Sequence, residues 1–493
     1  MINSQKQENI INTLNILLIV TIVYFLLFRV LNLTPDLINK HSWGESQYAM
    51  WASSYLRDGY FFGVREVDYF KPFTNYIPIA SYLAASVSDL FATDLVFTGR
   101  MISFLFSVLS VVFFYKLVGI IFNDKFKALV TTVIFVVLPI SMYYSGMLYN
   151  DPIHLFFIVC LTYLLYSKRD SAGIKFYYSS VFMLTILILL TKPTAAIIFG
   201  LPILYLSYDD WRNGRFDKKE FYCIMSALAI VVGFFIITRM TYSDAYAVEK
   251  DKLISQAVLA ELGVYLKKAW GQLSFHFQHY YYIYIAALPI AAFSEARIRF
   301  FFFMSLGFFI FYALFIKGAL IHQYYSLPFV VPFSIIVAYG MFKYTGILLK
   351  NKLWFAVVVI AVLIMFSPTK RHMYYMFKPE YSRDIMYVVE TVKKIKGDKK
   401  IFVSAHGHKS FQYYLNIPYD DVRSKWGNRG PISELLDRKQ INTLIVHNHP
   451  DASPIVNDIQ DKDFRRIYCS SKYLVYIRDP GVNEVDDCVM KLD

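Results

Sequence analysis

Long apolar runs recur along this 493-residue chain from Leu14 to Phe366. A helix of roughly 20 apolar residues crosses the hydrocarbon core of a bilayer with all its internal backbone hydrogen bonds formed. About eleven runs reach or approach that length. The predicted fold is therefore mainly α, a polytopic membrane protein with about eleven transmembrane helices. The approximate centres of these runs are Val23, Ser110, Phe135, Val159, Ile186, Pro202, Val231, Ala287, Phe309, Ser334 and Val359.

Composition agrees with this class, because 56% hydrophobic and 18% aromatic residues make the chain too apolar for a soluble protein of this size. The net charge of +13 arises from Lys and Arg in alternate short loops, so nucleic acid is not an expected partner. The short loops that alternate with these basic loops carry one Lys or none. The Lys- and Arg-rich loops, predicted to be cytoplasmic, are 123–127, 167–175, 207–219, 294–299 and 341–352.

This bias predicts a multi-pass protein of the plasma (inner) membrane with a cytoplasmic N-terminus. An odd number of spans then places the C-terminal segment outside. The predicted domains are a transmembrane module, residues 1–367, with a first outer loop at 34–94, and a small extracytoplasmic α/β domain, residues 368–493. In that second domain Glu380–Lys396 reads as a helix. The segments 400–403, 443–446 and 472–477 read as strands.

The first outer loop is rich in acids and aromatics close to the membrane. Within it, Glu45–Asp58 and Thr74–Leu90 have helical periodicity and are expected to lie in the interface plane. Glu45 is the only carboxylate between Asp36 and Asp58. It is a candidate for proton transfer, although a Glu in a first helical turn is also favoured by the helix dipole.

Asp151 is the second candidate carboxylate, at the start of the fourth predicted span and followed by Pro152. Those two residues also suit an ordinary helix start. His154 lies one turn further on the same helix face, so a divalent metal between His154 and Asp151 is conceivable, although two ligands are a weak signal. No other cofactor is indicated.

Several cations lie near the predicted outer boundary: Lys71, Arg100, Lys192, and Lys317 with His322. Arg100 and Lys192 in particular suit an anionic phosphate, because Arg and Lys are the side chains that grip phosphate. The alternative is that these side chains snorkel to the lipid headgroups. Lys317 fits the snorkelling alternative better than a phosphate site.

The cysteine and histidine pattern indicates no metal framework. Cys160 and Cys223 lie in apolar runs and read as buried small residues. Cys469 and Cys488 could pair if the C-terminal domain faces an oxidising compartment. Histidines 406, 408, 447 and 449 read as loop residues, because no Cys or acid cluster completes a ligand set around them.

The order of these features resembles bacterial GT-C superfamily glycosyltransferases, the group of protein O-mannosyltransferases and lipid A aminoarabinose transferases. The resemblance covers roughly the first 210 residues, and the segment 322–333 resembles a later family signature. One departure stands out: Gly44 precedes Glu45 where many relatives have an Asp before the Glu. The positions that carry the resemblance are Gly44, Glu45, Tyr48, Ala49, Lys71, Pro72, Arg100, Asp151, Lys192 and Pro193.

The resemblance implies a GT-C-like fold and inverting transfer of a sugar from a polyprenyl-phosphate-linked donor to a glycolipid, polysaccharide or protein acceptor at the outer face. It implies Glu45 or Asp151 as the catalytic carboxylate, and Arg100, Lys192 and Lys71 as ligands of the donor phosphate. The substrate-binding residues it implies are Tyr48, His322 and Tyr325.

Two other functions remain open from the sequence. A transporter or flippase for a lipid-linked sugar is one, although transporters usually show internal repeats and polar residues near the bilayer midplane. The other is an inactive scaffold that binds lipid-linked sugars, which Gly44 in place of Asp keeps open. Membrane lipid is a partner in every case.

Overall fold

The computed structural model describes the chain in separate segments. The described residues are 4–31, 42–59, 63–66, 69–72, 76–167, 174–241, 262–316, 322–348, 384–395, 401–404, 408–415, 422–423, 441–447, 464–469 and 473–478.

The chain forms two compact units. The first comprises Met1–Leu33, Pro72–Leu83 and Gly99–Tyr375, and the second comprises Thr34–Lys71, Ala84–Thr98 and Met376–Asp493. The C-terminal segment thus shares a unit with most of the first outer loop. The predicted boundary at residue 367 lies outside the described residues and stays a prediction.

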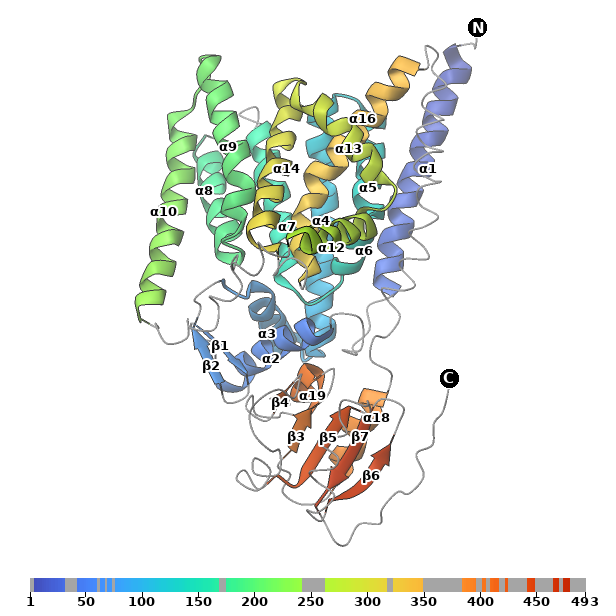
Figure 1. The fold of residues 1–493 in the computed structure, drawn as a ribbon. Coiled ribbons are helices and arrows are strands. Elements are labelled where there is room, and N and C mark those ends of the chain that lie inside the picture. The colour runs from blue at the N-terminus through green and yellow to red at the C-terminus, as the bar shows by residue number, and fades with distance from the viewer. Residues whose placement is uncertain are drawn as a thin grey trace. The chain divides into compact units, whose positions relative to one another are not determined.

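The first unit is built of helices (Figure 1). Helices α3 (Ile79–Phe91) and α4 (Leu95–Phe122) contribute to both units. Each predicted span centre among the described residues falls inside a helix, and Val359 lies outside them. The other elements of the first unit are α1 (Ser4–Leu31), α5 (Lys125–Val137), α6 (Pro139–Tyr144), α7 (Asn150–Ser167), α8 (Ile174–Thr191), α9 (Ala195–Arg212), α10 (Lys218–Thr241), α12 (Leu262–Phe277), α13 (Tyr280–Ala292), α14 (Ala296–Leu314), the 3₁₀-helix η3 (Gln323–Phe329) and α16 (Val330–Leu348).

The protein is a membrane protein with a mainly helical fold, as the apolar runs predict. Five described helices are long and apolar enough to cross a membrane: Asn12–Val30, Leu95–Phe122, Lys218–Thr238, Ala296–Leu314 and Gln323–Thr345. Apolar helices that are shorter in the described structure include Ile79–Phe91, Lys175–Thr191 and Tyr280–Ala292. The count of about eleven spans therefore stays a prediction.

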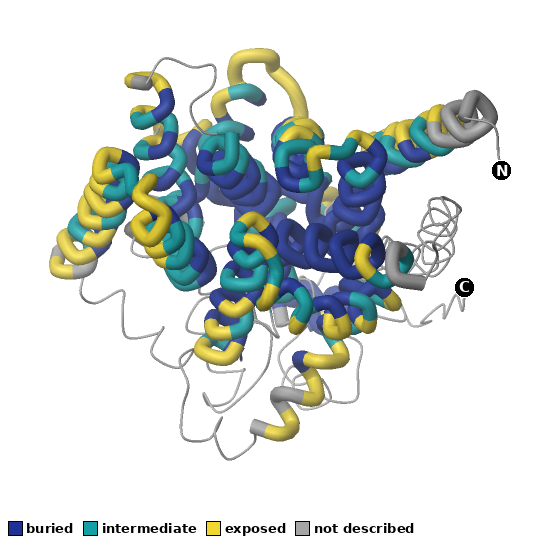
Figure 2. The backbone as a smooth tube through the Cα atoms, turned by 90° about the horizontal axis from the view of Figure 1, so that it is seen from above, coloured by how far each residue is buried: buried dark blue, intermediate teal, exposed yellow. Residues whose placement is uncertain are grey.

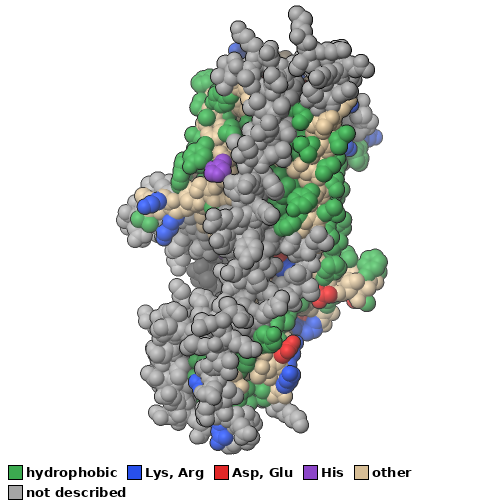
Figure 3. Space-filling view, turned by 90° about the vertical axis from the view of Figure 1, so that its right-hand side faces the viewer, with side chains coloured by type: hydrophobic (Ala, Val, Ile, Leu, Met, Phe, Trp, Pro, Cys, Tyr) green, Lys and Arg blue, Asp and Glu red, His purple; other side chains and the backbone are tan. Residues whose placement is uncertain are grey.

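Burial separates central from peripheral helices (Figure 2). In the most apolar window of Gln323–Thr345, 94% of residues are buried, against 17% for Asn12–Val30 and 22% for Lys218–Thr238. The apolar residues exposed on α1 and α10 suit contact with lipid. On the face drawn in Figure 3, hydrophobic side chains likewise cover much of the described surface of the helices.

The second unit contains a small α/β domain, as predicted. Its five-stranded sheet has the order β4-β3-β5-β7-β6; β3 pairs in parallel with β4 and β5, whereas β7 pairs antiparallel with β5 and β6. The predicted helix and three strands correspond to α18, β3, β5 and β7; α19, β4 and β6 were not predicted. The elements are α18 (Asp384–Lys394), β3 (Ile401–Ser404), α19 (His408–Leu415), β4 (Val422–Arg423), β5 (Thr443–His447), β6 (Arg465–Cys469) and β7 (Tyr473–Ile477).

The core of this domain follows from amphipathic patterning. Ile385, Val388, Val389 and Val392 fall on one face of α18 at helical spacing and are all buried. They pack with buried residues of the sheet and with Phe411 of α19. Because one helix face and the strands share a single apolar cluster, the domain has a hydrophobic core of its own.

The first outer loop contributes α2 (Ser42–Asp58) and a two-stranded ribbon of β1 (Gly63–Glu66) and β2 (Tyr69–Pro72) to the second unit. The helix predicted at Glu45–Asp58 is α2. The helix predicted to begin at Thr74 is α3, which begins only at Ile79. Ile77 precedes Pro78, and the helical conformation is unfavourable for a residue that precedes a proline.

Helix α2 packs against α19 of the C-terminal domain within this unit, and the buried hydroxyls of Ser46 and Ser410 hydrogen-bond at 3.1 Å. Cys469 is disulfide-bonded. Cys160 and Cys223 are free thiols. Cys488 lies outside the described residues.

Candidate active site

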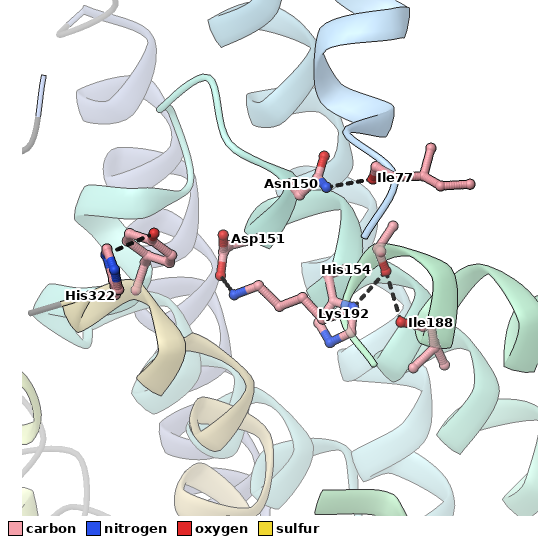
Figure 4. Close-up of polar contacts among 9 residues, drawn as sticks. Ile77, Asn150, Asp151, His154, Ile188, Lys192 and His322 are labelled. Atoms are coloured by element: carbon pink, nitrogen blue, oxygen red, sulfur yellow. Dashed lines mark hydrogen bonds and ion pairs between the residues drawn. The ribbon is translucent and has the colours of Figure 1, made fainter. Parts of the chain in front are cut away.

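An ion pair between Asp151 and Lys192 lies in the first unit, where α7 begins and α8 ends (Figure 4). Pro152 follows Asp151 and favours a helix start there, since the first helical positions need no backbone N–H partner. Lys192 comes directly after the last residue of α8 and donates a hydrogen bond from Nζ to Asp151 Oδ1. The Asp151 side chain is 0% exposed and that of Lys192 is 13% exposed.

The carboxylate of Asp151 is only half satisfied. Oδ1 is held by Lys192, whereas Oδ2 is buried and has no hydrogen-bond partner among the described residues. A buried acceptor without a donor costs about 1–3 kcal/mol, and more when the group is charged. The geometry therefore leaves one carboxylate oxygen able to take a hydrogen bond from an incoming hydroxyl.

Aromatic rings enclose the ammonium group of Lys192. Its Nζ lies 4.5 Å from the centroid of Tyr325 and 5.0 Å from that of Tyr324, within range of cation–π attraction. The Tyr324 hydroxyl is 3.1 Å from His322 Nδ1, and its ring packs on Tyr149 at 4.9 Å. The residues His322 and Tyr325 predicted to bind substrate thus lie beside the ion pair.

His154, which Figure 4 shows near Lys192, makes a second buried contact with Thr191, the residue before Lys192. Thr191 Oγ1 lies 2.8 Å from His154 Nδ1, 2.7 Å from the Leu187 carbonyl and 2.9 Å from the Ile188 carbonyl. A hydroxyl has one proton, and here the two carbonyls accept it. With the Thr191 proton directed to these carbonyls, Nδ1 of His154 is the donor to Thr191 Oγ1.

Asn150 joins the start of α7 to the segment that leads into α3. Its Nδ2 donates to the Ile77 carbonyl at 2.8 Å, and its Oδ1 accepts from Ala80 N at 2.9 Å. Ile77 N also donates to the Leu190 carbonyl at 2.8 Å. The ends of α7 and α8 that carry the ion pair are thereby tied through one extended segment.

The remaining predicted residues belong to other helices and strands. Arg100 is 2% exposed in α4. Glu45 and Tyr48 are buried in α2 of the second unit, at 0% and 6% exposure, and Lys71 lies in strand β2. Lys317 lies outside the described residues. Cooperation of Glu45 with Asp151 stays a prediction.

No group of three or more His, Cys, Asp or Glu suited to a metal ion occurs among the described residues. Asp151 and His154 each have a separate partner, Lys192 and Thr191. A metal between Asp151 and His154 stays a prediction, because these bonds engage only Oδ1 of Asp151 and Nδ1 of His154.

The sequence predicted no role in the site for Thr191, Tyr149, Tyr324 or Asn150. Each is adjacent in sequence to a predicted site residue or belongs to the turn before Asp151. A polar or aromatic residue next to a buried charge in an apolar run is the signal that points to them.

Comparison with known proteins places this geometry in context. The family model described as dolichyl-phosphate-mannose-protein mannosyltransferase matches residues 71–237, which include Asp151 and Lys192. None of the curated protein sequences matches the chain significantly.

Solved structures similar to the chain include ArnT from Cupriavidus metallidurans bound to undecaprenyl phosphate, with 11% identity, a TM-score of 0.66, and coverage of 94% of this chain and 98% of that chain. AglB, the oligosaccharyltransferase of Archaeoglobus fulgidus in complex with an inhibitory peptide and a dolichol-phosphate, has 11% identity and a TM-score of 0.55, and the match covers 87% of this chain and 69% of that one. AftD, an arabinofuranosyltransferase from Mycobacteria, has 12% identity and a TM-score of 0.52, with coverage of 95% and 40%.

The chain is thus a membrane protein with the fold of the GT-C glycosyltransferases. The family model that matches part of the chain, residues 71–237, is the one described as dolichyl-phosphate-mannose-protein mannosyltransferase. The resemblance predicted from the order of the motifs is confirmed.

Proposed function

We propose that the chain is an integral-membrane glycosyltransferase that moves a sugar from a polyprenyl-phosphate carrier to an acceptor hydroxyl at the outer face of the membrane. The observation that carries this proposal is the half-satisfied carboxylate of Asp151, fixed through Oδ1 by Lys192 and buried without a donor at Oδ2. A catalytic base needs this combination of fixed orientation and an open acceptor position.

In the proposed reaction the acceptor oxygen attacks the anomeric carbon of the donor sugar. The bond from that carbon to the phosphate oxygen breaks, and its electron pair leaves with the polyprenyl phosphate. The proton of the acceptor hydroxyl passes to Asp151 Oδ2. Attack opposite the leaving group inverts the anomeric centre.

Lys192 is proposed to stabilise the leaving phosphate. An ammonium has three N–H donors, so Lys192 can keep its bond to Asp151 and still reach a phosphate oxygen. The rings of Tyr324 and Tyr325 help to hold the ammonium at that position. Arg100, and Lys71 from the outer loop, are proposed as further phosphate ligands; a fixed cation where charge develops lowers the barrier.

Glu45 is the alternative catalytic carboxylate. It is fully buried in the first turn of α2 and follows Gly44 at the position where relatives carry an acidic pair. Tyr48, one turn further along α2, is then the proposed substrate contact next to it, and His322 and Tyr325 are the substrate contacts proposed beside Lys192.

The proposed orientation has the N-terminus in the cytoplasm of a cell whose plasma (inner) membrane holds the protein, and the C-terminal domain outside. The charge bias of the loops supports it. The disulfide at Cys469 also supports it, since disulfides persist in oxidising compartments. An outward-facing site requires a lipid-linked donor, because nucleotide sugars remain in the cytoplasm.

The test is transfer of labelled sugar by purified protein from a panel of polyprenyl-phosphate sugars, offered with glycolipid, polysaccharide and peptide acceptors. Wild type is compared with Asp151→Asn and Glu45→Gln, which keep side-chain size and remove the basic oxygen. Donor binding is measured on the same samples. We expect Asp151→Asn to bind donor and to lose transfer by about 100-fold or more.

Loss of transfer in Glu45→Gln alone would move the catalytic role to Glu45. Donor binding by all three proteins with no transfer to any acceptor would contradict the proposal and favour a binding scaffold. Donor movement across proteoliposome membranes without transfer would instead identify a flippase.

A further inference from the structure

Arg29 is a buried cation near the end of α1, a helix that otherwise lies at the edge of the first unit. Only 17% of the most apolar window of α1 is buried, yet Arg29 is 2% exposed. A charged side chain within a membrane span is costly and marks a position with a specific role. Neither the motif analysis nor the proposed reaction uses Arg29.

Arg29 binds the corner where α5 ends and α6 begins. Leu138 breaks the helix with φ −59° and ψ 130°, and Pro139 has no N–H to donate. The last carbonyls of α5 therefore lack the amide partners that a continuing helix would supply. Arg29 Nη2 donates to one of them, the Val136 carbonyl, at 2.9 Å, and lies 3.3 Å from Ser141 Oγ in α6.

Both partners of Arg29 are neutral. Its Nε is buried with no acceptor, and no ion pair is formed by Arg29 in the part of the chain that the structure describes. A buried cation held only by neutral acceptors contributes less to stability than a well-packed apolar residue of its size would. What the guanidinium does provide is a planar donor that bridges two elements with a fixed geometry.

The corner leads directly to the candidate active site. In α6, Tyr144 packs edge-on to Tyr149 at 6.2 Å and to Tyr324 at 6.0 Å. Tyr149 immediately precedes Asn150 and Asp151 at the start of α7, and Tyr324 covers the ammonium of Lys192. Each contact from Arg29 to the ion pair is therefore an observed one.

The far side of the same corner is held by α4. Ser107 Oγ donates to the Ser145 carbonyl at 3.0 Å. A Cβ added to Gly99 would approach the Leu148 side chain closely, so that helix and corner are in tight contact. Helix α4 contacts one side, and Arg29 supplies a polar contact from the α1 side.

We propose that Arg29 is a positioning residue for the Asp151–Lys192 pair, acting through the α5–α6 corner and the tyrosines that follow it. The inference rests on the proposed function for its catalytic consequence, whereas the geometry of the corner can be tested without any substrate.

The experiment compares Arg29→Gln, Arg29→Lys and the control Phe25→Ala in detergent-purified full-length protein. Phe25 is a buried residue one turn earlier on α1, at 2% exposure, so its truncation weakens α1 packing without touching the Val136 carbonyl. Hydrogen exchange is followed at the corner amides of Ser145, Met147 and Tyr149, which are bonded within the corner. Transfer rate and donor KM are measured below the unfolding temperature of each variant.

We expect faster corner exchange in Arg29→Gln than in Phe25→Ala, and a fall in kcat of about 10- to 100-fold at little-changed KM, the range for a small misplacement of reacting groups. Arg29→Lys restores part of both, since Lys keeps the donor and loses the planar fork. Corner exchange equal to that of wild type in Arg29→Gln, or equal losses in Phe25→Ala, would overturn the inference. Changed exchange in a protein whose wild type transfers no sugar would leave the positioning role intact and count against the proposed function alone.

Discussion

At the scale of single residues, the Asp151–Lys192 pair couples stability to the proposed activity. Removing Lys192 leaves a buried carboxylate without a counter-charge, which typically costs about 3–5 kcal/mol. We therefore expect Lys192→Met to lower the unfolding temperature markedly. The double variant Asp151→Asn with Lys192→Met has no buried charge at this place, so it should regain most of that loss.

Thermal unfolding of the four proteins of this cycle in one detergent gives the coupling between the two residues. Sugar transfer should be absent from both variants that lack Lys192. The double variant can regain folding stability, but it has no cation at this position to stabilise the leaving phosphate. If the double variant were as unstable as Lys192→Met, Lys192 would not be the main partner of Asp151.

At the scale of helices, one close approach sets how α14 packs on α9. A Cβ built at Gly307 would lie 2.7 Å from the Ile198 carbonyl oxygen and 2.8 Å from that of Ile197, both rigid backbone atoms. Gly307→Val should therefore push the helices apart and destabilise the protein by about 1–3 kcal/mol, as overpacking does. Gly233 in α10 is the matched control, because a Cβ there meets nothing within 4 Å. Gly233→Ala should leave the thermal unfolding midpoint unchanged or slightly higher, and equal loss in both variants would contradict the packing argument.

Sequence reasoning predicted helix positions well where composition alone decides them, and less well where backbone geometry intervenes. Apolar runs located helices of the first unit, and the spacing of Ile385, Val388 and Val392 located α18. The break at Leu138 and Pro139 lies inside one continuous apolar run, so hydropathy gave no sign of the corner. Asp151 and Lys192 were each singled out, but nothing in the sequence shows that they bond, because the pairing depends on how α7 and α8 pack.

At the scale of the whole molecule, the first outer loop and the C-terminal domain form one unit although more than 280 residues separate them in the chain. Ser46 directly follows Glu45 in α2 and bonds to Ser410 in α19. Tyr413 in α19 is half-buried; its partial removal from water raises its hydroxyl pKa, and a hydrogen bond to Ser53 of α2 opposes the rise. The C-terminal domain is therefore part of what holds the loop helix that carries Glu45.

This shared unit requires the loop and the C-terminal domain to face the same side of the membrane, and the loop charges predict the outer side. Cysteine labelling on intact cells tests this in a Cys223→Ser background, since Cys160 is buried and Cys469 is disulfide-bonded. Tyr387 in α18 is 57% exposed and Asn213 lies in an exposed turn after α9, so cysteine at either position is accessible to reagent. A membrane-impermeant maleimide should label Tyr387→Cys in intact cells and Asn213→Cys only after permeabilisation. The reverse pattern would place the C-terminal domain in the cytoplasm, where the proposed lipid-linked donor would no longer be required.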